Sequence, residues 1–339
     1  MSDNKTTAHI PILDGWRALS ILLVLAGHWL PIGRPEWRMN ESVAASGMAL
    51  FFCLSGFLIT QFLLADQRIG VFLIKRYFRI IPLAWLATII LIVAQSPPTQ
   101  TAIANLLFYA NLPTPQLLEG GGHFWSLFVE IQFYIFMAIL VFVGGRRALY
   151  LVPIFAICIT LLRISDNTTI SIVTWYRVDE IFAGGCVALA WNNKTISRYC
   201  RALPAFLSPS LLFLLLLVSL PQSGFLGYFR PYAAGLTIFV SLYAFPVHLY
   251  KLWTGKVARY IAQISYAVYV FHGMLTATAL GGGDVGKIEK YVLRVPLALV
   301  TWLLSHISTF YYEKAAIKFG ARLVTKISNR SAGNKPVNE

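Results

Sequence analysis

Three ionisable residues interrupt one apolar stretch near the start of the chain. The stretch, LDGWRALSILLVLAGHWL at residues 13–30, contains Asp14, Arg17 and His28. An ionisable side chain at the centre of a bilayer costs at least about 2.5–3.5 kcal/mol, so such side chains face a cavity or a charged partner. Histidine can accept a proton from a hydroxyl near neutral pH, and arginine can bind an anion. These residue types therefore predict chemistry or transport within a membrane.

The spacing of these residues places them on a helix. Arg17 and His28 are about three helical turns apart, so both lie on one face and are separated by about 16 Å. Asp14 precedes Arg17 by three residues, a spacing that permits an ion pair within the helix. Asp14 and Arg17 are therefore either an ion pair at the helix entrance or part of a substrate site. His28 is either a hydrogen-bonded structural residue or part of a reaction centre.

Other apolar segments also contain ionisable residues. Glu130 lies in GHFWSLFVEIQFYIF, and nothing on its own helix neutralises it. Arg177 and Asp179 lie in WYRVDEIFAGG, where an ion-pair network is favoured over a catalytic role. His272 lies in ISYAVYVFHGM. We expect these residues to line a polar path across the protein.

A basic segment, IKRYFR at residues 74–79, places Lys75, Arg76 and Arg79 at a membrane surface. Such side chains bind phosphates through charge-assisted hydrogen bonds. They are also typical of topology signals and lipid anchors, so both interpretations stay open. Ser55, in FFCLSGFLIT, fits helix packing beside Gly56 better than it fits a nucleophile.

The elements that position these residues are apolar helices. The chain has 339 residues, 57% of them hydrophobic and only 12% charged, about half the charged fraction of a soluble domain. About ten stretches approach the length that a bilayer requires. They cover residues 11–30, 43–64, 79–96, 123–144, 148–163, 171–190, 204–220, 230–248, 258–280 and 291–312. The predicted fold class is all-α, a polytopic helical membrane protein with about ten transmembrane helices.

The net charge of +14 indicates topology and gives no reason to expect nucleic-acid binding. Ten spans put both termini on one side, and a cytoplasmic N-terminus places most of the 28 lysines and arginines in cytoplasmic segments. Membrane lipid is then an expected partner. The prediction divides the chain into a cytoplasmic tail at 1–10, a membrane domain at 11–313 and a basic cytoplasmic tail at 314–339. The four cysteines are isolated, and their spacing suggests neither a disulfide framework nor a metal site.

The order of several motifs resembles that of the acyltransferase 3 family of bacterial membrane acyltransferases. DGWRALSILLVLAGH resembles its opening helix, in which an Arg or Lys, ten further residues and a His correspond to Arg17 and His28. FFCLSGFLIT resembles its second-helix motif, and KRYFRIIPLAW its Arg-x-x-Arg segment. FWSLFVEIQFY is similar to a further motif that includes Trp125, Ser126 and Glu130. YRVDEIFAGG and ISYAVYVFH resemble two later motifs, and the six occur in family order from about residue 11 to 272.

The resemblance implies that an acyl group, acetyl by default, moves from cytoplasmic acetyl-CoA to a carbohydrate hydroxyl outside a bacterial inner membrane. Many members of the family modify O-antigen, exopolysaccharide, peptidoglycan or lipochitooligosaccharide signals, so a glycan or glycolipid is the expected acceptor. Larger members add a periplasmic esterase-like domain, which we do not expect here because about 26 residues follow the last span. Neither the acceptor sugar nor the oligomeric state is predicted.

We combine the resemblance with these positions to assign candidate roles. The candidate catalytic residues are His28, as general base or as acyl carrier, Glu130, which could orient that histidine or contact the sugar, and Asp14. The candidate CoA-binding residues are Arg17, Lys75, Arg76 and Arg79. The candidate substrate-binding or structural residues are Trp125, Ser126, Arg177, Asp179 and His272. No metal is expected.

Two other functions stay open. A transporter or flippase for a polar lipid or sugar intermediate would use the same intramembrane charges. The sequence contains no related halves and no matched broken helices, which argues against that alternative. An acyltransferase that acts on a small metabolite, such as a macrolide, would keep the chemistry and change the acceptor.

Overall fold

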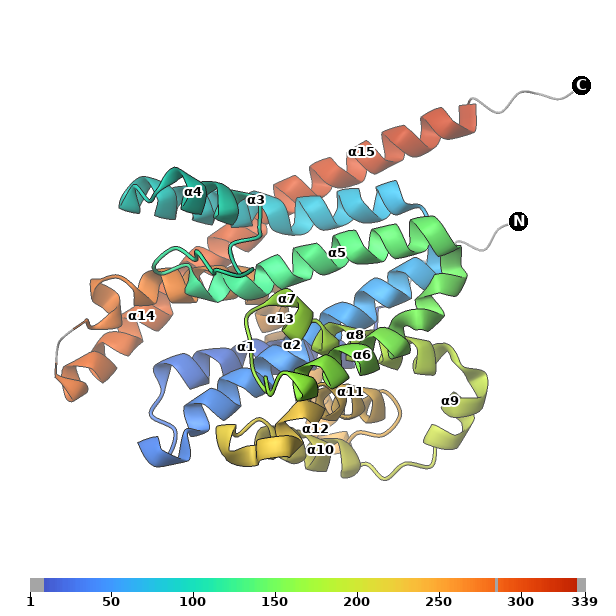
Figure 1. The fold of residues 1–339 in the computed structure, drawn as a ribbon, viewed down its shortest axis with the longest axis horizontal. Helices are drawn as coiled ribbons and strands as arrows, with labels where there is room; N and C mark the ends of the chain where they lie inside the picture. The colour runs from blue at the N-terminus through green and yellow to red at the C-terminus, as the bar shows by residue number, and fades with distance from the viewer. Residues whose placement is uncertain (1–8, 284–285, 334–339) are drawn as a thin grey trace, which may run out of the picture.

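The computed structural model describes residues 9–283 and 286–333. Residues 1–8 of the predicted N-terminal tail and 334–339 of the predicted C-terminal tail lie outside the described residues. All regular secondary structure in the described ranges is helical, which confirms the all-α prediction. Figure 1 shows long helices that run back and forth between two ends of the molecule, and the start of α1 and the end of α15 lie at the same end.

Every predicted apolar stretch overlaps at least one helix. The α-helices are α1 (Ile12–Trp29), α2 (Met39–Ala65), α3 (Ile69–Gln95), α4 (Thr99–Leu106), α5 (Trp125–Gly144), α6 (Val152–Ser165), α7 (Thr174–Arg177), α8 (Asp179–Asn192), α9 (Lys194–Cys200), α10 (Leu207–Val218), α11 (Arg230–Ser241), α12 (Val247–Trp253), α13 (Lys256–Thr276), α14 (Lys287–Ile307) and α15 (Lys314–Gly333). A short 3₁₀ helix, η2 (Gly122–Phe124), precedes α5.

Within the described residues, four helical segments are long and apolar enough to cross a membrane: Met39–Ala65, Ile69–Gln95, Gly122–Ser165 and Ile288–Asn329. The chain is therefore a helical, multi-pass membrane protein. The third segment joins two predicted spans because the chain stays helical between α5 and α6. Ten crossings and cytoplasmic termini remain predictions.

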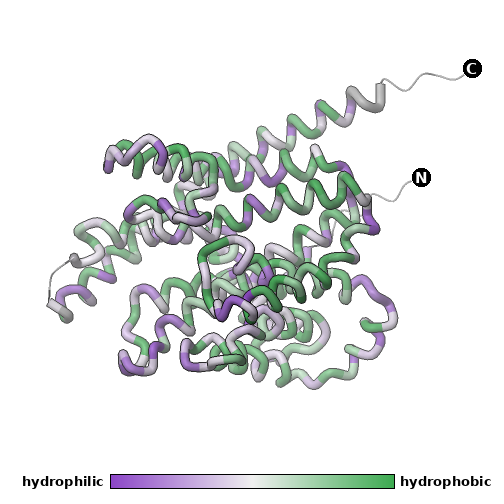
Figure 2. Tube along the Cα trace, viewed as in Figure 1, coloured by the Kyte–Doolittle hydropathy of each residue, from purple (hydrophilic) through white to green (hydrophobic). Residues whose placement is uncertain are grey.

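The predicted C-terminal tail contains a helix. Residues 314–333 form α15, which follows α14 through a π-helical turn and packs along α3. Phe319 contacts Phe78 with ring centroids 5.4 Å apart, and Gly320 lies against the same ring. Figure 2 shows α3 and α5 hydrophobic along most of their length, whereas hydrophilic and hydrophobic residues alternate along α15.

Helix α2 lies at the centre of the bundle and packs against α1, α5, α8 and α11. Its closest approach is to α8, where Gly56 faces the backbone of Ile181 and Gly184 faces the backbone of Cys53. A Cβ atom at either glycine would overlap a carbonyl oxygen, so only glycine permits this crossing. The predicted packing role of the Ser55–Gly56 region is confirmed for Gly56.

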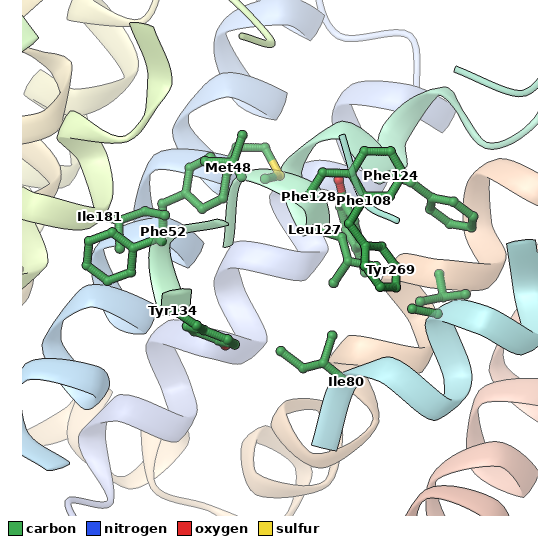
Figure 3. Close-up of a cluster of buried hydrophobic side chains, with 14 of the residues drawn as sticks. Met48, Phe52, Ile80, Phe108, Phe124, Leu127, Phe128, Tyr134, Ile181 and Tyr269 are labelled. Carbon is green, nitrogen blue, oxygen red and sulfur yellow. The ribbon is translucent and has the colours of Figure 1, made fainter. Parts of the chain in front are cut away.

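The largest apolar cluster holds α2, α5, α8 and α13 together. Figure 3 shows part of it, with side chains from all four helices pointing toward one another: Met48, Phe52, Leu127, Phe128, Tyr134, Ile181 and Tyr269. Phe52, Phe128 and Ile181 are fully buried. This cluster fixes the relative positions of the helices that carry the polar residues of the site.

Candidate active site

A cavity of about 610 Å³ lies beside the C-terminal end of α1. We call it the histidine cavity because His28, His123 and His272 line it, from α1, η2 and α13. Trp125, Arg177 and Tyr269 also line it. The described residues contain no group of three or more His, Cys, Asp or Glu side chains placed to hold a metal ion. The three histidines are therefore arranged by contacts with one another and with the backbone.

A hydrogen-bonded chain fixes the protonation of two of these histidines. His272 Nδ1 lies 2.6 Å from the carbonyl oxygen of Tyr269, which can only accept, so Nδ1 carries the proton. His272 is buried and has no carboxylate within 4 Å in the described part of the chain, so its Nε2 is an acceptor. His28 Nδ1 lies 3.0 Å from that Nε2 and must donate to it. When both rings are neutral, the Nε2 atom of His28 is then the unprotonated nitrogen.

This geometry makes His28 a candidate general base. Its ring stacks on that of His272, with centroids 5.1 Å apart and planes 6° from parallel. Both residues line the cavity, but His28 is exposed whereas His272 is only 1% exposed. The two residues are 244 positions apart, so sequence spacing gave no indication that they pair.

His123 also lies in this site, although the sequence gave little reason to expect it there. Its Nε2 lies 3.0 Å from the carbonyl oxygen of Val270, and its ring packs on His272 with centroids 4.6 Å apart. Gly273 permits this contact, because a Cβ atom there would overlap the His123 ring. The only signal in the sequence was that His123 immediately precedes the FWSLFVE motif.

A second cavity, of about 40 Å³, lies deeper in the bundle and is lined by α1, α2, α3, α5 and α13. We call it the arginine cavity because Arg17, Arg76 and Arg79 line it. None of these guanidinium groups has a carboxylate within 4 Å in the described part of the chain. Together they form a concentrated and unpaired positive charge.

Glu130 lines the arginine cavity as well. It is 5% exposed, and its Oε1 accepts hydrogen bonds from the hydroxyls of Ser55 and, at 2.5 Å, Tyr134. Ser55 therefore donates a hydrogen bond to a buried carboxylate. It also precedes Gly56, the glycine at the α2–α8 crossing. Both bonds position the carboxylate among the arginines.

Two larger cavities flank the arginine cavity. One, of about 450 Å³, is lined by Asp14, Arg17 and Arg76 among others. The other, of about 300 Å³, is lined by Asp14, Arg17 and Arg79 among others. Because Arg17 lines all three cavities, it links them into one cationic region.

The described structure does not show the Asp14–Arg17 ion pair that the sequence left open, and it places Lys75 apart from the cavities that Arg76 and Arg79 line. Asp14 does not pair with Arg17 in the described structure; it bonds His9 at 2.9 Å and lies 4.0 Å from Arg259. Lys75 does not join the other basic residues, since it is exposed on α3, 5.1 Å from the ring of Phe62, and lines none of the three cavities.

Glu130 and His28 are not brought together. They line different cavities, and the rings of Phe51 and Tyr269 stack between these cavities with centroids 6.0 Å apart. Phe51 lines the arginine cavity and Tyr269 the histidine cavity. Ser126 holds Tyr269 through a hydrogen bond of 2.5 Å between the two hydroxyls. The expectation that Glu130 orients His28 therefore does not fit this geometry, whereas a role beside the arginines does.

Arg177 and Asp179 belong to a buried ionic cluster, as their spacing predicted. Asp179 bonds Arg163, and Glu180 bonds Arg230 at 2.7 Å. Arg177 lies 3.4 Å from Glu180. The two carboxylates also lie in the first turn of α8, where the helix dipole favours negative charge. Arg163 and Arg230 were not among the predicted site residues, because their partners lie on other helices.

Comparisons with known proteins agree with this architecture. The family described as an acyltransferase domain matches residues 10–310. YrhL of Bacillus subtilis (strain 168) is 25% identical over 92% of this chain and 56% of its own length. Peptidoglycan O-acetyltransferase OatA of Listeria monocytogenes is 24% identical over 78% of this chain and 49% of its own length.

A third relative is similar along almost its whole length. Nodulation protein 10 of Rhizobium leguminosarum bv. viciae is 23% identical over 96% of this chain and 98% of its own length. The chain thus spans about half the length of the first two relatives and nearly all of the third. No solved structure matches.

Proposed function

The chain belongs to the acyltransferase 3 family, and from this we propose that it is a membrane O-acyltransferase, with acetyl as the transferred group. The donor is cytoplasmic acetyl-CoA, and the acceptor is a hydroxyl of a glycan or glycolipid outside a bacterial inner membrane. Exopolysaccharide, O-antigen and lipochitooligosaccharide are candidate acceptors. The observation that carries the proposal is the pair of cavities along α1, one cationic and one containing the hydrogen-bonded pair of His28 and His272.

The cationic region is the proposed donor site. Unpaired guanidinium groups bind phosphate oxygens through charge-assisted hydrogen bonds, and CoA carries several phosphates. Arg76 and Arg79 lie one helical turn apart on α3 and face the flanking cavities, which have room for parts of the donor. The N-terminal position of Arg17 on α1 places this region at the end where the chain begins, which the charge distribution predicts to be cytoplasmic.

The histidine cavity is the proposed acceptor site. The acceptor hydroxyl gives its proton to His28 Nε2 while its oxygen attacks the thioester carbonyl carbon. The carbon–sulfur bond then breaks, and the thiolate of CoA takes the proton from His28. His272 keeps His28 in the reactive tautomer and shares the positive charge that forms on it. The rings of Phe51 and Tyr269 must separate for the thioester to reach His28.

The test is acyl transfer by purified protein in lipid vesicles. Labelled acetyl-CoA and candidate glycans should give an alkali-labile O-acetyl product. His28→Ala should lower the rate by about 10²–10⁴-fold, the usual contribution of a general base, without loss of folding. His306→Ala is a matched control, because His306 bonds Tyr260 away from both cavities.

Two outcomes would contradict the proposal. Movement of a glycan or lipid across the vesicle membrane without any acetylated product would indicate a transporter. Acetylation of a small metabolite such as a macrolide, with no glycan product, would keep the chemistry and change the acceptor. An unchanged rate in His28→Ala would remove this histidine from the reaction.

A further inference from the structure

The ionic cluster beside the histidine cavity contains more positive than negative charge. Its members are Arg163, Arg177, Asp179, Glu180 and Arg230, and each is at most 3% exposed. Three guanidinium groups therefore face two carboxylates in a region with little water. A buried charge without a partner is costly, so the structure leaves one cation uncompensated.

Arg177 is that cation. The guanidinium of Arg163 bonds Asp179 and the carbonyl oxygen of Thr169, and Arg230 bonds Glu180 and that same carbonyl oxygen. Arg177 has only the 3.4 Å approach of Nη2 to Glu180. Its Nε and Nη1 atoms are buried without any hydrogen-bond partner.

Arg177 is also the member of the cluster that lines the histidine cavity. Its guanidinium carbon lies 5.2 Å from the ring of Trp125, which lines the same cavity, and 5.9 Å from that of Phe52. The guanidinium thus lies over two aromatic rings, which accept no N–H hydrogen bond in the ring plane, and its Nε and Nη1 atoms keep no hydrogen-bond partner among the described residues. Glu41, the carboxylate on the cavity lining, is bonded to Arg38 at 2.6 Å.

We propose that Arg177 binds an anionic group of the acceptor, so that the histidine cavity selects an acidic sugar. The anion is a carboxylate on the sugar or a phosphate ester that links the sugar to a lipid. The unpartnered N–H groups of this guanidinium can each donate a charge-assisted hydrogen bond to an oxygen of either anion. The anion neutralises the excess charge of the cluster and holds the sugar within the cavity that contains His28. This inference rests on the proposed acyl transfer and adds the acceptor class to it.

The experiment compares matched acceptors. Acetyl transfer is measured for a glucoside and the corresponding glucuronide, and separately for a glucose 1-phosphate lipid and its uncharged glycoside. The wild type should show a kcat/KM at least about tenfold higher for one acidic member, the ratio that a single charge-assisted hydrogen bond supplies. Arg177→Gln should remove this preference and leave the neutral acceptor within about threefold of the wild type. Arg177→Lys should keep part of it.

Arg34→Gln is the matched control, because Arg34 is an exposed arginine 5.9 Å from the ring of Trp37 and does not line the cavity. It should keep the acidic preference. An equal loss for acidic and neutral acceptors in Arg177→Gln would assign the residue to folding or to the reacting carbonyl. Equal wild-type rates for both members of each pair would overturn the inference while acyl transfer itself stands.

A second measurement separates this inference from the reaction. Direct binding of the glucuronide and of the phosphate lipid to the purified protein is measured without acetyl-CoA. Binding that requires Arg177 would support the acidic site even if no acetyl group were transferred. Failure of both anions to bind, or binding that Arg177→Gln leaves unchanged, would overturn it.

Discussion

Two groups of three arginines stand out in the described structure, one buried and one lining the cationic cavities, and they differ in their partners. Arg163 and Arg230 bond carboxylates on α8, and only Arg177 in that group keeps free N–H groups. By contrast, Arg17, Arg76 and Arg79 have no carboxylate within 4 Å in the described part of the chain.

This difference in partners predicts a structural role for the paired arginines and a binding role for the unpaired ones. A buried and paired arginine mainly holds helices together, and its loss leaves an opposite charge without a partner. An unpaired arginine at a cavity is available to a ligand. The same residue type therefore predicts opposite phenotypes in the two groups, on stability in one and on substrate affinity in the other.

The largest expected effect is on the paired group. Arg163→Gln leaves Asp179 buried beside an uncharged side chain, and the free energy of unfolding should fall by about 3–5 kcal/mol. Thermal unfolding of the purified protein in detergent measures this change. Arg146→Gln, on the 3₁₀ turn after α5, is the control and should leave the unfolding temperature unchanged. Equal stability of both variants would show that the pairing contributes nothing to the fold.

The unpaired group should respond in the opposite way. Arg76→Gln combined with Arg79→Gln should raise the KM for acetyl-CoA about 100-fold, because each lost charge-assisted bond costs roughly tenfold. The unfolding temperature should stay close to that of the wild type. Lys75→Gln is the matched control, since Lys75 is exposed outside the three cavities. An unchanged KM would indicate that the two arginines anchor lipid and do not bind acetyl-CoA.

A further prediction concerns Glu130, the carboxylate that lines the arginine cavity, and the stability that its hydrogen bonds contribute. Ser55→Ala removes one bond to Glu130 and leaves that of Tyr134. The free energy of unfolding should fall by about 1 kcal/mol, the usual net contribution of one hydrogen bond. Ser210→Ala on α10 is the control, because that hydroxyl bonds only the carbonyl oxygen of Phe206. A loss no larger than in this control would show that Ser55 does not hold Glu130.

The smallest expected effect concerns an exposed ion pair between α2 and α3. The hydrogen bonds from Arg68 hold the pKa of Asp66 below its usual value. A carboxylate with a lowered folded-state pKa stabilises the fold above its unfolded pKa of about 3.9, and this contribution is lost as the pH falls further. Asp66→Asn should therefore lower the unfolding temperature slightly at pH 7 and not at pH 3. An equal shift at both values would rule out the charge as its source.

The sequence predicted the cationic region better than the histidine cavity. Arg17, Arg76 and Arg79 could be grouped because the family resemblance implies a shared CoA-binding role, and burial costs require charges in apolar helices to face a cavity. The pairing of His28 with His272 depends on the packing of α1 against α13, which no local pattern specifies. For the same reason the sequence could not place Arg163 and Arg230 opposite α8.

Helix boundaries were least predictable in segments that are both rich in charged residues and helical. Helix α3 begins at Ile69, ten residues before the predicted span at 79–96, because the basic segment is helical as well. Residues 314–333 read as a charged tail, yet their apolar residues pack on α3 as α15. Hydropathy alone marks where a helix enters lipid and not where the helix starts.

The stacked rings of Phe51 and Tyr269 have a consequence for the cell. A continuous aqueous passage wide enough for a thioester would also conduct protons and would discharge the gradient that drives ATP synthesis. The proposed reaction therefore requires the rings of Phe51 and Tyr269, whose centroids are 6.0 Å apart, to close this passage between turnovers. Under the proposed reaction, such a closed resting state would let an acyl group cross an energised membrane without a leak of ions.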